Sequence, residues 1–276
     1  MANSNQVFFS VIIPCYNAAT TIDRCLNSCL DQTCRDFEVI VIDDASTDTS
    51  SEMVRARQPE FAAVSIRLEL ITLSENLGQA AARNLGWEKA SGAFIAFLDA
   101  DDFWHCCKLA TVRHFLQMNP TLSLLAHRYT ERHGHEWQRQ TEPSAFILKP
   151  VSFRRLLFKN VAACPCWVVR ASLDERFDPQ MRFSEDRDLW VRVAHRHRCA
   201  ILHGPPLTCL GRPQHSTGGI SSQKLRLRSG EIRVYLHAAR LEPALLPMLP
   251  MLFLYSLLKT IRRELLLWLR VDGGQY

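Results

Sequence analysis

The sequence predicts an α/β fold, in which a mostly parallel sheet carries flanking helices and is followed by a helical C-terminal extension. Three observations predict it. Short apolar runs alternate with amphipathic stretches over the first hundred residues, which is the pattern of a parallel sheet covered on both faces. Polar clusters follow directly after three of these runs. The last fifth of the chain is rich in leucine and basic residues and lacks strand-like alternation.

The first hundred residues contain four expected strands and three expected helices. Each expected strand is a short apolar run bounded by turn residues, and in the helices apolar residues recur at helical spacing. The expected strands are Phe8–Pro14, Phe37–Ile42, Ile66–Leu73 and Phe94–Leu98. The expected helices are residues 20–32, 49–58 and Gln79–Ala90.

The middle of the chain is less regular. Short apolar runs occur at Phe153–Phe158 and Cys166–Arg170. We expect a helix over residues 106–118, a strand over 121–126 and a helix over Met181–Ala194. Residues 204–222 are rich in Gly, Pro and Ser and are expected to form a loop of about nineteen residues. Loops of that length in compact domains are usually lids or binding loops, or else disordered segments.

Composition indicates a soluble globular protein. The 276 residues are 47% hydrophobic and 22% charged, which excludes a disordered chain and a polytopic membrane protein. The N-terminus lacks the features of a signal peptide, so the ten cysteines are expected to be reduced and mostly buried. Their spacing does not match a structural zinc site.

The excess positive charge lies at the C-terminal end. Residues 1–223 carry 24 basic and 24 acidic residues, whereas residues 224–276 carry 9 and 4. A nucleic-acid-binding protein would have a larger basic surface, so no nucleic acid is expected as a partner. Basic residues beside apolar ones favour binding to an anionic membrane surface. The alternatives are a helical appendage packed on the main domain and a dimer interface.

The apolar part of this extension is predicted to lie on a surface. Between Glu242 and Lys259 there are 16 uncharged residues, fewer than the roughly 20 that span a bilayer. Three prolines also interrupt the beginning of this stretch. The sequence therefore predicts an interfacial helix or hairpin rather than a membrane span.

Polar side chains follow the first, second and fourth expected strands. Tyr16 and Asn17 follow the first, Asp43 and Asp44 the second, and the run 99–102 (DADD) the fourth. Ligands bind at the carboxyl ends of parallel strands, so these clusters predict one binding site. Neither a dinucleotide fingerprint nor a P-loop is present.

Two acidic motifs suggest chemistry at this site. Asp99 and Asp101 are two residues apart at a strand end and can converge on Mg²⁺ or Mn²⁺, which prefer oxygen ligands. Glu185 and Asp186 stand at the start of a predicted helix. An acidic pair there is favourable beside the helix dipole in any protein. The other interpretation is a general base that reaches an acceptor hydroxyl.

Five motifs occur in the order and at the spacing of a known family. They are VIIPCYN (11–17), VIDDASTD (41–48), NLGQAAARN (76–84), FLDADD (97–102) and SEDRDLW (184–190). With them, the sequence resembles the family 2 glycosyltransferases, which are inverting enzymes with the GT-A nucleotide-sugar-binding fold. The resemblance covers roughly residues 8–222. It implies a GT-A catalytic domain over residues 1–223, with residues 224–276 as an extension.

The resemblance also implies roles for individual residues. Asp186 would be the catalytic base, with Glu185 holding its geometry or the acceptor. Asp44 would accept from the ring N–H of the base, while Asp43 orients the loop. Asp101 would be the main metal ligand, assisted by Asp99 and His215. The nucleotide-sugar site would comprise Pro14, Tyr16, Asn17, Asp44, Asn76, Gly78, Arg83, Asp99, Asp102 and Arg212, with Asn84 beside them.

Several of these assignments have alternatives. Arg83 also fits an exposed helix residue, and His215 fits an exposed loop residue. Arg212 and Ser221 lie where such enzymes often have a loop that closes over the diphosphate. Residues 104–109 (WHCCKL) lack the proline that many relatives have there, so the start of the following helix is open. His105 in this segment is a further metal candidate or a surface residue.

The implied reaction moves one sugar from a nucleoside-diphosphate sugar to a hydroxyl of a lipid-linked or cell-surface polysaccharide acceptor. The resemblance favours UDP-sugars and a divalent cation (Mg²⁺ or Mn²⁺). The basic, Leu- and Trp-rich C-terminal extension favours a location at the inner face of the cytoplasmic membrane. The QxxRW motif and the several spans of processive members are missing, which favours single addition. One alternative is an inactive nucleotide-sugar-binding protein. Another is a sugar nucleotidyltransferase, which would need a Gly-rich loop where residues 14–20 read PCYNAAT. The donor sugar, the acceptor and the oligomeric state stay open.

Overall fold

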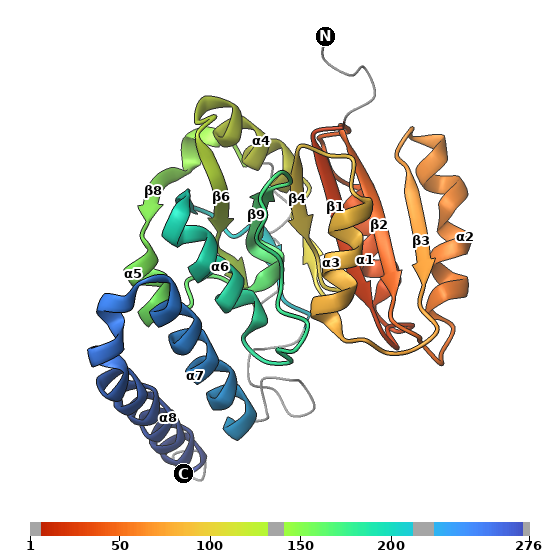
Figure 1. Cartoon of the computed structure of the whole chain (residues 1–276). Helices are drawn as coiled ribbons and strands as arrows, with labels where there is room; N and C mark the ends of the chain where they lie inside the picture. The colour runs from red at the N-terminus through yellow and green to blue at the C-terminus, as the bar shows by residue number, and fades with distance from the viewer. Residues whose placement is uncertain (1–6, 132–140, 212–223, 273–276) are drawn as a thin grey trace.

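A central eight-stranded sheet organises the molecule (Figure 1). The structure is a computed structural model and describes residues 7–131, 141–211 and 224–272. The strands are β1 (Phe9–Cys15), β2 (Phe37–Asp43), β3 (Leu68–Thr72), β4 (Phe94–Phe97), β5 (Phe103–Trp104), β6 (Leu122–His127), β7 (Tyr129–Thr130), β8 (Ile147–Val151), β9 (Trp167–Arg170), β10 (Arg198–His203) and β11 (Thr208–Cys209).

Helices connect and cover these strands. The α-helices are α1 (Ile22–Leu30), α2 (Ser50–Ala63), α3 (Gln79–Lys89), α4 (Lys108–Met118), α5 (Phe153–Phe158), α6 (Glu185–Arg196), α7 (Lys224–Leu241) and α8 (Leu249–Asp272). Short 3-10 turns are η2 (Pro143–Ala145), η3 (Cys164–Cys166) and η5 (Pro243–Met248).

The sheet has the order β3-β2-β1-β4-β9-β6-β10-β8. The first four of these strands run parallel, as do β6 and β10. β9 runs antiparallel to β4 and β6, and β8 runs antiparallel to β10. The prediction of a mostly parallel sheet with flanking helices is therefore confirmed. A second sheet, β5-β11-β7, stands beside the carboxyl end of β4.

Two hydrophobic cores cover the two faces of the large sheet. One face carries α1, α2 and α4, with Val11 and Ile13 of β1 buried against them. The other carries α3, α5, α6 and α7, with Ile12 of β1 and Phe97 of β4 among the buried side chains. The central strands are buried on both faces, which explains why their sequences read as continuous apolar runs.

The C-terminal extension is helical, as predicted. α7 packs its Val234, Tyr235 and Ala238 into the same core as α6. α8 runs alongside α7 (Figure 1). Within the described residues, one helical stretch, Pro243–Arg262, is long and apolar enough to cross a membrane by length and composition. It has 20 residues because it includes Lys259 and Arg262, beyond the 16 uncharged residues counted above.

The structure corrects several expected elements. β11 lies inside the predicted loop 204–222, and the remainder of that loop beyond residue 211 is outside the described residues. α2 continues past residue 58 through Pro59 to Ala63, because Pro59 is exposed and buried Phe61 anchors the last turn. β5, β7, β8 and β10 were not expected. β5 and β7 have only two residues each, too few for a periodic signal.

The cysteines are mostly buried, as predicted. Nine of the ten are buried, Cys106 is partly exposed, and all are free thiols. The side-chain ligand atoms of His105, Cys106 and Cys107 lie within 4.8 Å of one another. His105 is buried rather than a surface residue, and its Nδ1 accepts the N–H of Cys107. α4 begins immediately afterwards at Lys108.

Candidate active site

The predicted polar clusters meet at the carboxyl edge of β1, β2 and β4. Their loops have unusual backbone conformations. Asn17, Ala45 and Ser184 have positive φ angles of 49°, 62° and 59°. Gly78 has φ of 88°, a conformation that favours glycine. Strained backbone of this kind, at about 1–3 kcal/mol a position, tends to gather at functional sites.

The loops after β1 and β2 are joined by hydrogen bonds. Asn17 accepts at its side-chain oxygen from the backbone N–H of Thr47, at 2.8 Å. The backbone N–H of Asn17 donates to the hydroxyl of Ser46, at 3.0 Å. Tyr16, between these contacts and the end of β1, is 52% exposed. A planar aromatic face is therefore presented to solvent at the sheet edge, held by a fixed backbone, with partly buried Pro14 just before it.

Asp44 holds the loop that leads into α3. Its two carboxylate oxygens accept the backbone N–H groups of Leu77 and Gly78 at 2.7 and 2.8 Å. Asn76 donates its side-chain amide to the backbone carbonyl of Asp44. Asp43 accepts from Ser46 and Ser51 and orients its own loop. Asp44 thus fixes the position of this loop, and its contact with a nucleobase stays a prediction.

Arg83 joins the two acidic motifs. It lies on α3 and is only 1% exposed, so the alternative of a surface helix residue is wrong. Its guanidinium donates to Asp99 at 2.6 Å and to Glu185 at 3.0 Å. Gln79, one turn earlier, donates to the same Glu185 oxygen at 2.6 Å. One buried cation thereby brings the end of β4 and the start of α6 to a single site.

The acidic run after β4 is crowded with negative charge. Burial, together with the nearby Asp99 and Asp101, raises the pKa of Asp102 to about 8. Asp102 accepts the backbone N–H of Gly211 at 2.8 Å. Arg24 of α1 donates to the backbone carbonyl of Asp101. The segment after β11 is therefore fastened directly to this acidic run.

Glu185 and Asp186 form the first turn of α6. Burial and the neighbouring Asp186 raise the pKa of Glu185 to about 7, although Arg83 opposes the shift. Desolvation also raises the pKa of Asp186, against a hydrogen bond from the backbone N–H of Arg187 at 2.7 Å. Asp186 is partly exposed, whereas Glu185 is 4% exposed. Of the pair, Asp186 is the carboxylate that an incoming molecule can reach.

The donor set at the end of β4 fits a divalent cation. Three carboxylates lie within four residues, and their repulsion contributes to the raised pKa of Asp102. A bound cation relieves that repulsion, and carboxylate oxygens are the ligands that Mg²⁺ and Mn²⁺ prefer. Asp101 and Asp99 are the residues that would hold it, with one Asp99 oxygen occupied by Arg83.

The remaining predicted residues fall in three groups. Tyr16, Asn17, Asp44, Asn76, Gly78, Arg83 and the acidic run are brought together at one edge. Asn84 instead binds the backbone of Phe177 with both atoms of its amide, at 2.8 and 3.0 Å. Arg212, His215 and Ser221 lie outside the described residues. Sequence reasoning missed Gln79 and Arg24, although the one-turn spacing of Gln79 from Arg83 was a usable signal.

The fold and the matched motifs define a class. The family model for glycosyl transferase family 2 matches residues 10–177, which is more than half of the chain and contains four of the five motifs. The chain belongs to this family of glycosyltransferases.

Named relatives and solved structures agree with this family. The chain is 38% identical over 236 residues to "Putative teichuronic acid biosynthesis glycosyltransferase TuaG" of Bacillus subtilis (strain 168), covering 84% of this chain and 88% of that protein. It is 40% identical over 115 residues to an uncharacterized glycosyltransferase of Haemophilus influenzae, covering 42% and 44%. The chain thus spans less than half of the length of that second relative.

Two solved structures have the same fold. S. aureus TarS 1-349 in complex with UDP-GlcNAc gives a TM-score of 0.67 at 22% identity, covering 84% of this chain and 66% of that one. The mannosyltransferase PcManGT from Pyrobaculum calidifontis, in complex with GDP-Man and Mn²⁺, gives 0.66 at 21% identity, covering 99% and 82%. These likenesses support the GT-A architecture.

Proposed function

We propose that this protein is an inverting glycosyltransferase that moves a single sugar from a nucleoside-diphosphate sugar to a hydroxyl of a lipid-linked or cell-surface polysaccharide acceptor. The observation that carries the proposal is the pair of salt bridges from Arg83 to Asp99 and Glu185. They bring together Asp99, from the motif predicted to hold the metal and the diphosphate, and Glu185, which stands beside the predicted base. Two solved proteins of this fold are in complex with UDP-GlcNAc and with GDP-Man, respectively. We favour a UDP-sugar because family 2 glycosyltransferases more often use UDP-sugars.

Asp186 acts as the general base in this proposal. Its raised pKa brings the carboxylate closer to the basicity suited to accepting a hydroxyl proton near neutral pH. It removes the proton from the acceptor hydroxyl as the acceptor oxygen forms a bond to the anomeric carbon. The bond from that carbon to the diphosphate oxygen breaks, and the nucleoside diphosphate leaves with the electron pair. One displacement inverts the anomeric configuration.

The other residues orient the reactants. Arg83 and Gln79 hold Glu185 beside the base. Asp44 fixes the loop at Gly78, and Tyr16 offers its exposed ring to the nucleobase. A divalent cation held by Asp101 and Asp99 would neutralise charge on the departing diphosphate. Arg212 and His215, which lie outside the described residues, remain predicted contributors.

The proposal includes peripheral binding to the inner face of the cytoplasmic membrane. The stretch Pro243–Arg262 is only 17% buried over its most apolar window. Its middle nevertheless packs on the body of the protein, because Leu252 and Ser256 are 0% and 1% exposed. A helix that is docked at its middle cannot cross a bilayer while the body stays outside. Its exposed apolar face favours lying at the interface.

The first test is a donor screen with purified full-length protein, Mg²⁺ or Mn²⁺, membrane extract as the acceptor source, and release of nucleoside diphosphate as the signal. Asp186→Asn is expected to lower turnover by about 10²–10⁴-fold while donor binding persists. Asp101→Ala is expected to weaken metal-dependent donor binding. Glu88→Gln, an exposed residue of α3, is the control and should behave as wild type.

Three results of this screen would separate the alternatives. Turnover abolished by both active-site substitutions supports the transferase. Metal-dependent donor binding without turnover favours an inactive nucleotide-sugar-binding protein. Formation of a nucleotide sugar from a sugar phosphate and a nucleoside triphosphate would instead indicate a nucleotidyltransferase.

A further inference from the structure

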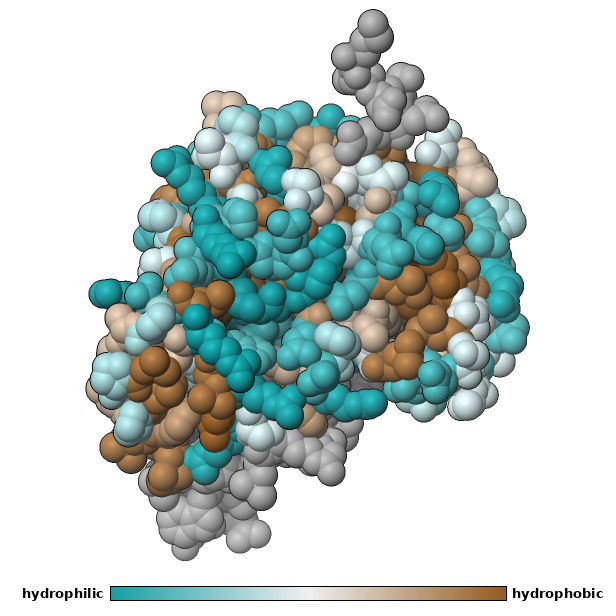
Figure 2. Space-filling view, viewed as in Figure 1, coloured by the Kyte–Doolittle hydropathy of each residue, from teal (hydrophilic) through white to brown (hydrophobic). Residues whose placement is uncertain are grey.

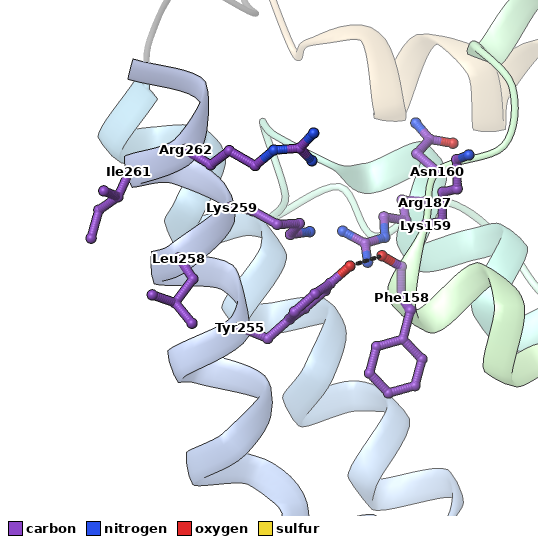
Figure 3. Close-up of a pocket in the computed structure, with 9 residues that line it drawn as sticks. All are labelled: Phe158, Lys159, Asn160, Arg187, Tyr255, Leu258, Lys259, Ile261 and Arg262. Atoms are coloured by element: carbon purple, nitrogen blue, oxygen red, sulfur yellow. Dashed lines mark hydrogen bonds between the residues drawn. The ribbon is translucent and has the colours of Figure 1, made fainter. Parts of the chain in front are cut away.

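A groove of about 1020 Å³ lies between α8 and the segment that follows α5 (Figure 3). Four cationic side chains line it: Lys159, Arg187, Lys259 and Arg262. None of the described residues that line it is acidic. We call it the cationic groove. In Figure 3, Lys259 and Arg262 extend from α8 toward Arg187.

Among the side chains that the structure describes, one carboxylate balances this charge. Glu231 of α7 accepts from Arg187 at 2.6 Å and also accepts from Lys259. Four cations against one anion leave three positive charges at the groove. Lys159 and Arg262 are both exposed, so they can reach a ligand without breaking a buried contact. The groove is therefore suited to a compact ligand with two or three negative charges.

The groove opens beside an apolar surface. On α8, Met251, Leu254 and Leu258 are 51–54% exposed. Figure 2 shows hydrophobic side chains gathered over this part of the molecule, at the lower left. Leu258 and Ile261 point outward from the helix, away from the cations (Figure 3). An exposed apolar area next to a charged pocket fits a ligand with a charged head and an apolar chain.

The groove is connected to the proposed base through Arg187, the next residue in the chain. Arg187 donates its backbone N–H to Asp186, while its side chain lines the groove. Its guanidinium is fixed by the backbone carbonyls of Leu156 and Leu157 as well as by Glu231. The first turn of α6 therefore joins the base to the groove through one residue.

We propose that the cationic groove binds the diphosphate of a lipid-linked acceptor, with the lipid chain lying along the exposed apolar face of α8. This inference rests on the proposed function and names where its acceptor binds. An ordinary anionic phospholipid carries about one negative charge in its headgroup, whereas a diphosphate that joins a lipid to a sugar carries about two, which is closer to the excess at the groove. The sugar end of the acceptor then extends toward Asp186.

The test uses the full chain with vesicles of phosphatidylcholine that contain a few per cent of a polyprenyl diphosphate. The comparison vesicles contain phosphatidylglycerol instead, in an amount that gives the same total negative charge. We expect the wild type to bind the first kind at least about tenfold more tightly. The double variant Lys159→Gln/Arg262→Gln should lose that preference, about tenfold in affinity. The matched control, Lys149→Gln/Arg154→Gln, removes two exposed charges outside the groove and should keep it.

Equal binding to both kinds of vesicle would overturn the inference and indicate a general anionic surface. So would a double variant that binds polyprenyl diphosphate as well as the wild type does. Donor binding, measured in the same preparations by calorimetry, separates this inference from the proposed function. Donor binding without lipid selectivity would contradict the assignment of the groove and leave the transferase proposal standing. Lipid selectivity without donor binding would contradict the transferase proposal and leave a site for a diphosphate lipid that has no role as an acceptor site.

Discussion

Two charged regions share the first turn of α6, because Glu185 belongs to one and Arg187 to the other, and they are built in opposite ways. The acidic centre comprises Asp99, Asp101, Asp102, Glu185 and Asp186 around the buried cation Arg83. The cationic groove has four basic side chains and, among the described residues, one acid paired with two of them, Glu231. In each region one buried charged side chain pairs with two of the opposite sign: Arg83 with Asp99 and Glu185, and Glu231 with Arg187 and Lys259. The acidic centre is short of positive charge, and the groove is short of negative charge.

The difference between the two regions shifts the pKa values of two buried glutamates in opposite directions. Both Glu185 and Glu231 form a salt bridge with an arginine. Burial and Asp186 raise the pKa of Glu185 to about 7. Burial also opposes ionisation of Glu231, but Arg187 and the hydrogen bonds from Lys259 and Ser256 outweigh it and lower the pKa to about 2. The surplus of charge around the pair, rather than the pair itself, therefore decides protonation.

Removing Arg83 should produce the largest effect. Arg83→Met leaves Glu185 and Asp99 without their shared cation, and we expect a loss of about 3–5 kcal/mol in unfolding free energy. Arg83→Lys keeps the charge but replaces the two separate nitrogens that contact Asp99 and Glu185 with one, so it should retain more stability yet lower turnover by about 10²-fold. Urea unfolding and the donor assay give the two values.

The control for Arg83 is Arg55→Met, because Arg55 is exposed on α2. It should stay within about 0.5 kcal/mol of the wild type. If Arg83→Met were as mild as Arg55→Met, the salt bridges to the acidic centre would not hold the two motifs together.

Glu231→Gln should have the second largest effect. The folded pKa of about 2 lies below the ordinary value of 4.5, so ionised Glu231 stabilises the protein above pH 4.5, and this is lost as the pH falls through 2. The difference corresponds to about 3 kcal/mol. Unfolding free energies of wild type and variant should therefore converge between pH 4.5 and 2. A constant gap over that range would contradict the assignment.

Glu185→Gln should also change how the free energy of unfolding depends on pH, but with the opposite sign to Glu231→Gln. The folded pKa of Glu185, about 7, lies above the ordinary 4.5, so its contribution to stability is present below pH 4.5 and is lost as the pH rises through 7. In the wild type, stability should fall with rising pH by up to about 1.4 kcal/mol per unit within this window. The variant should lack that part of the slope. Parallel curves for the two proteins from pH 4.5 to 7 would show that Glu185 titrates normally.

The sequence predicted the acidic centre better than the groove, for physical reasons. Asp99 and Asp101 follow a buried strand directly, so the edge of the sheet brings them to Asp44 without further information. The resemblance placed Arg83 at the site, but its burial could not be predicted, because an arginine one turn into a helix has the same pattern whether it is exposed or buried. The groove depends on how α8 docks beside Arg187, and helix docking is set by tertiary packing rather than by helical periodicity.

The success of the secondary-structure predictions also depended on burial. The strands β1, β2 and β4 were predicted to within a residue or so, because strands buried on both faces give continuous apolar runs. β8 was missed because it is an edge strand with exposed Ile147 and with Pro150. Exposed strand positions carry little hydrophobic pattern, so single-sequence reasoning has nothing to detect there.

The smallest expected effect on stability comes from removing one of two tyrosine hydroxyls, that of Tyr235 beneath the groove or that of Tyr255 at its edge, which we call the rim. Tyr235 is fully buried and donates its hydroxyl to Glu231 at 3.0 Å, so Tyr235→Phe should cost about 1–2 kcal/mol. Tyr255 is 37% exposed, and its hydroxyl is 3.5 Å from the carbonyl of Phe158 (Figure 3), so Tyr255→Phe should cost less than about 0.5 kcal/mol. Urea unfolding of both variants at pH 7 measures the difference. Equal costs would mean that the rim contact holds α8 as firmly as the bonds to Glu231 do. In that case the groove would be a fixed surface closed by its rim, and Glu231 would no longer explain how α8 is held against α7.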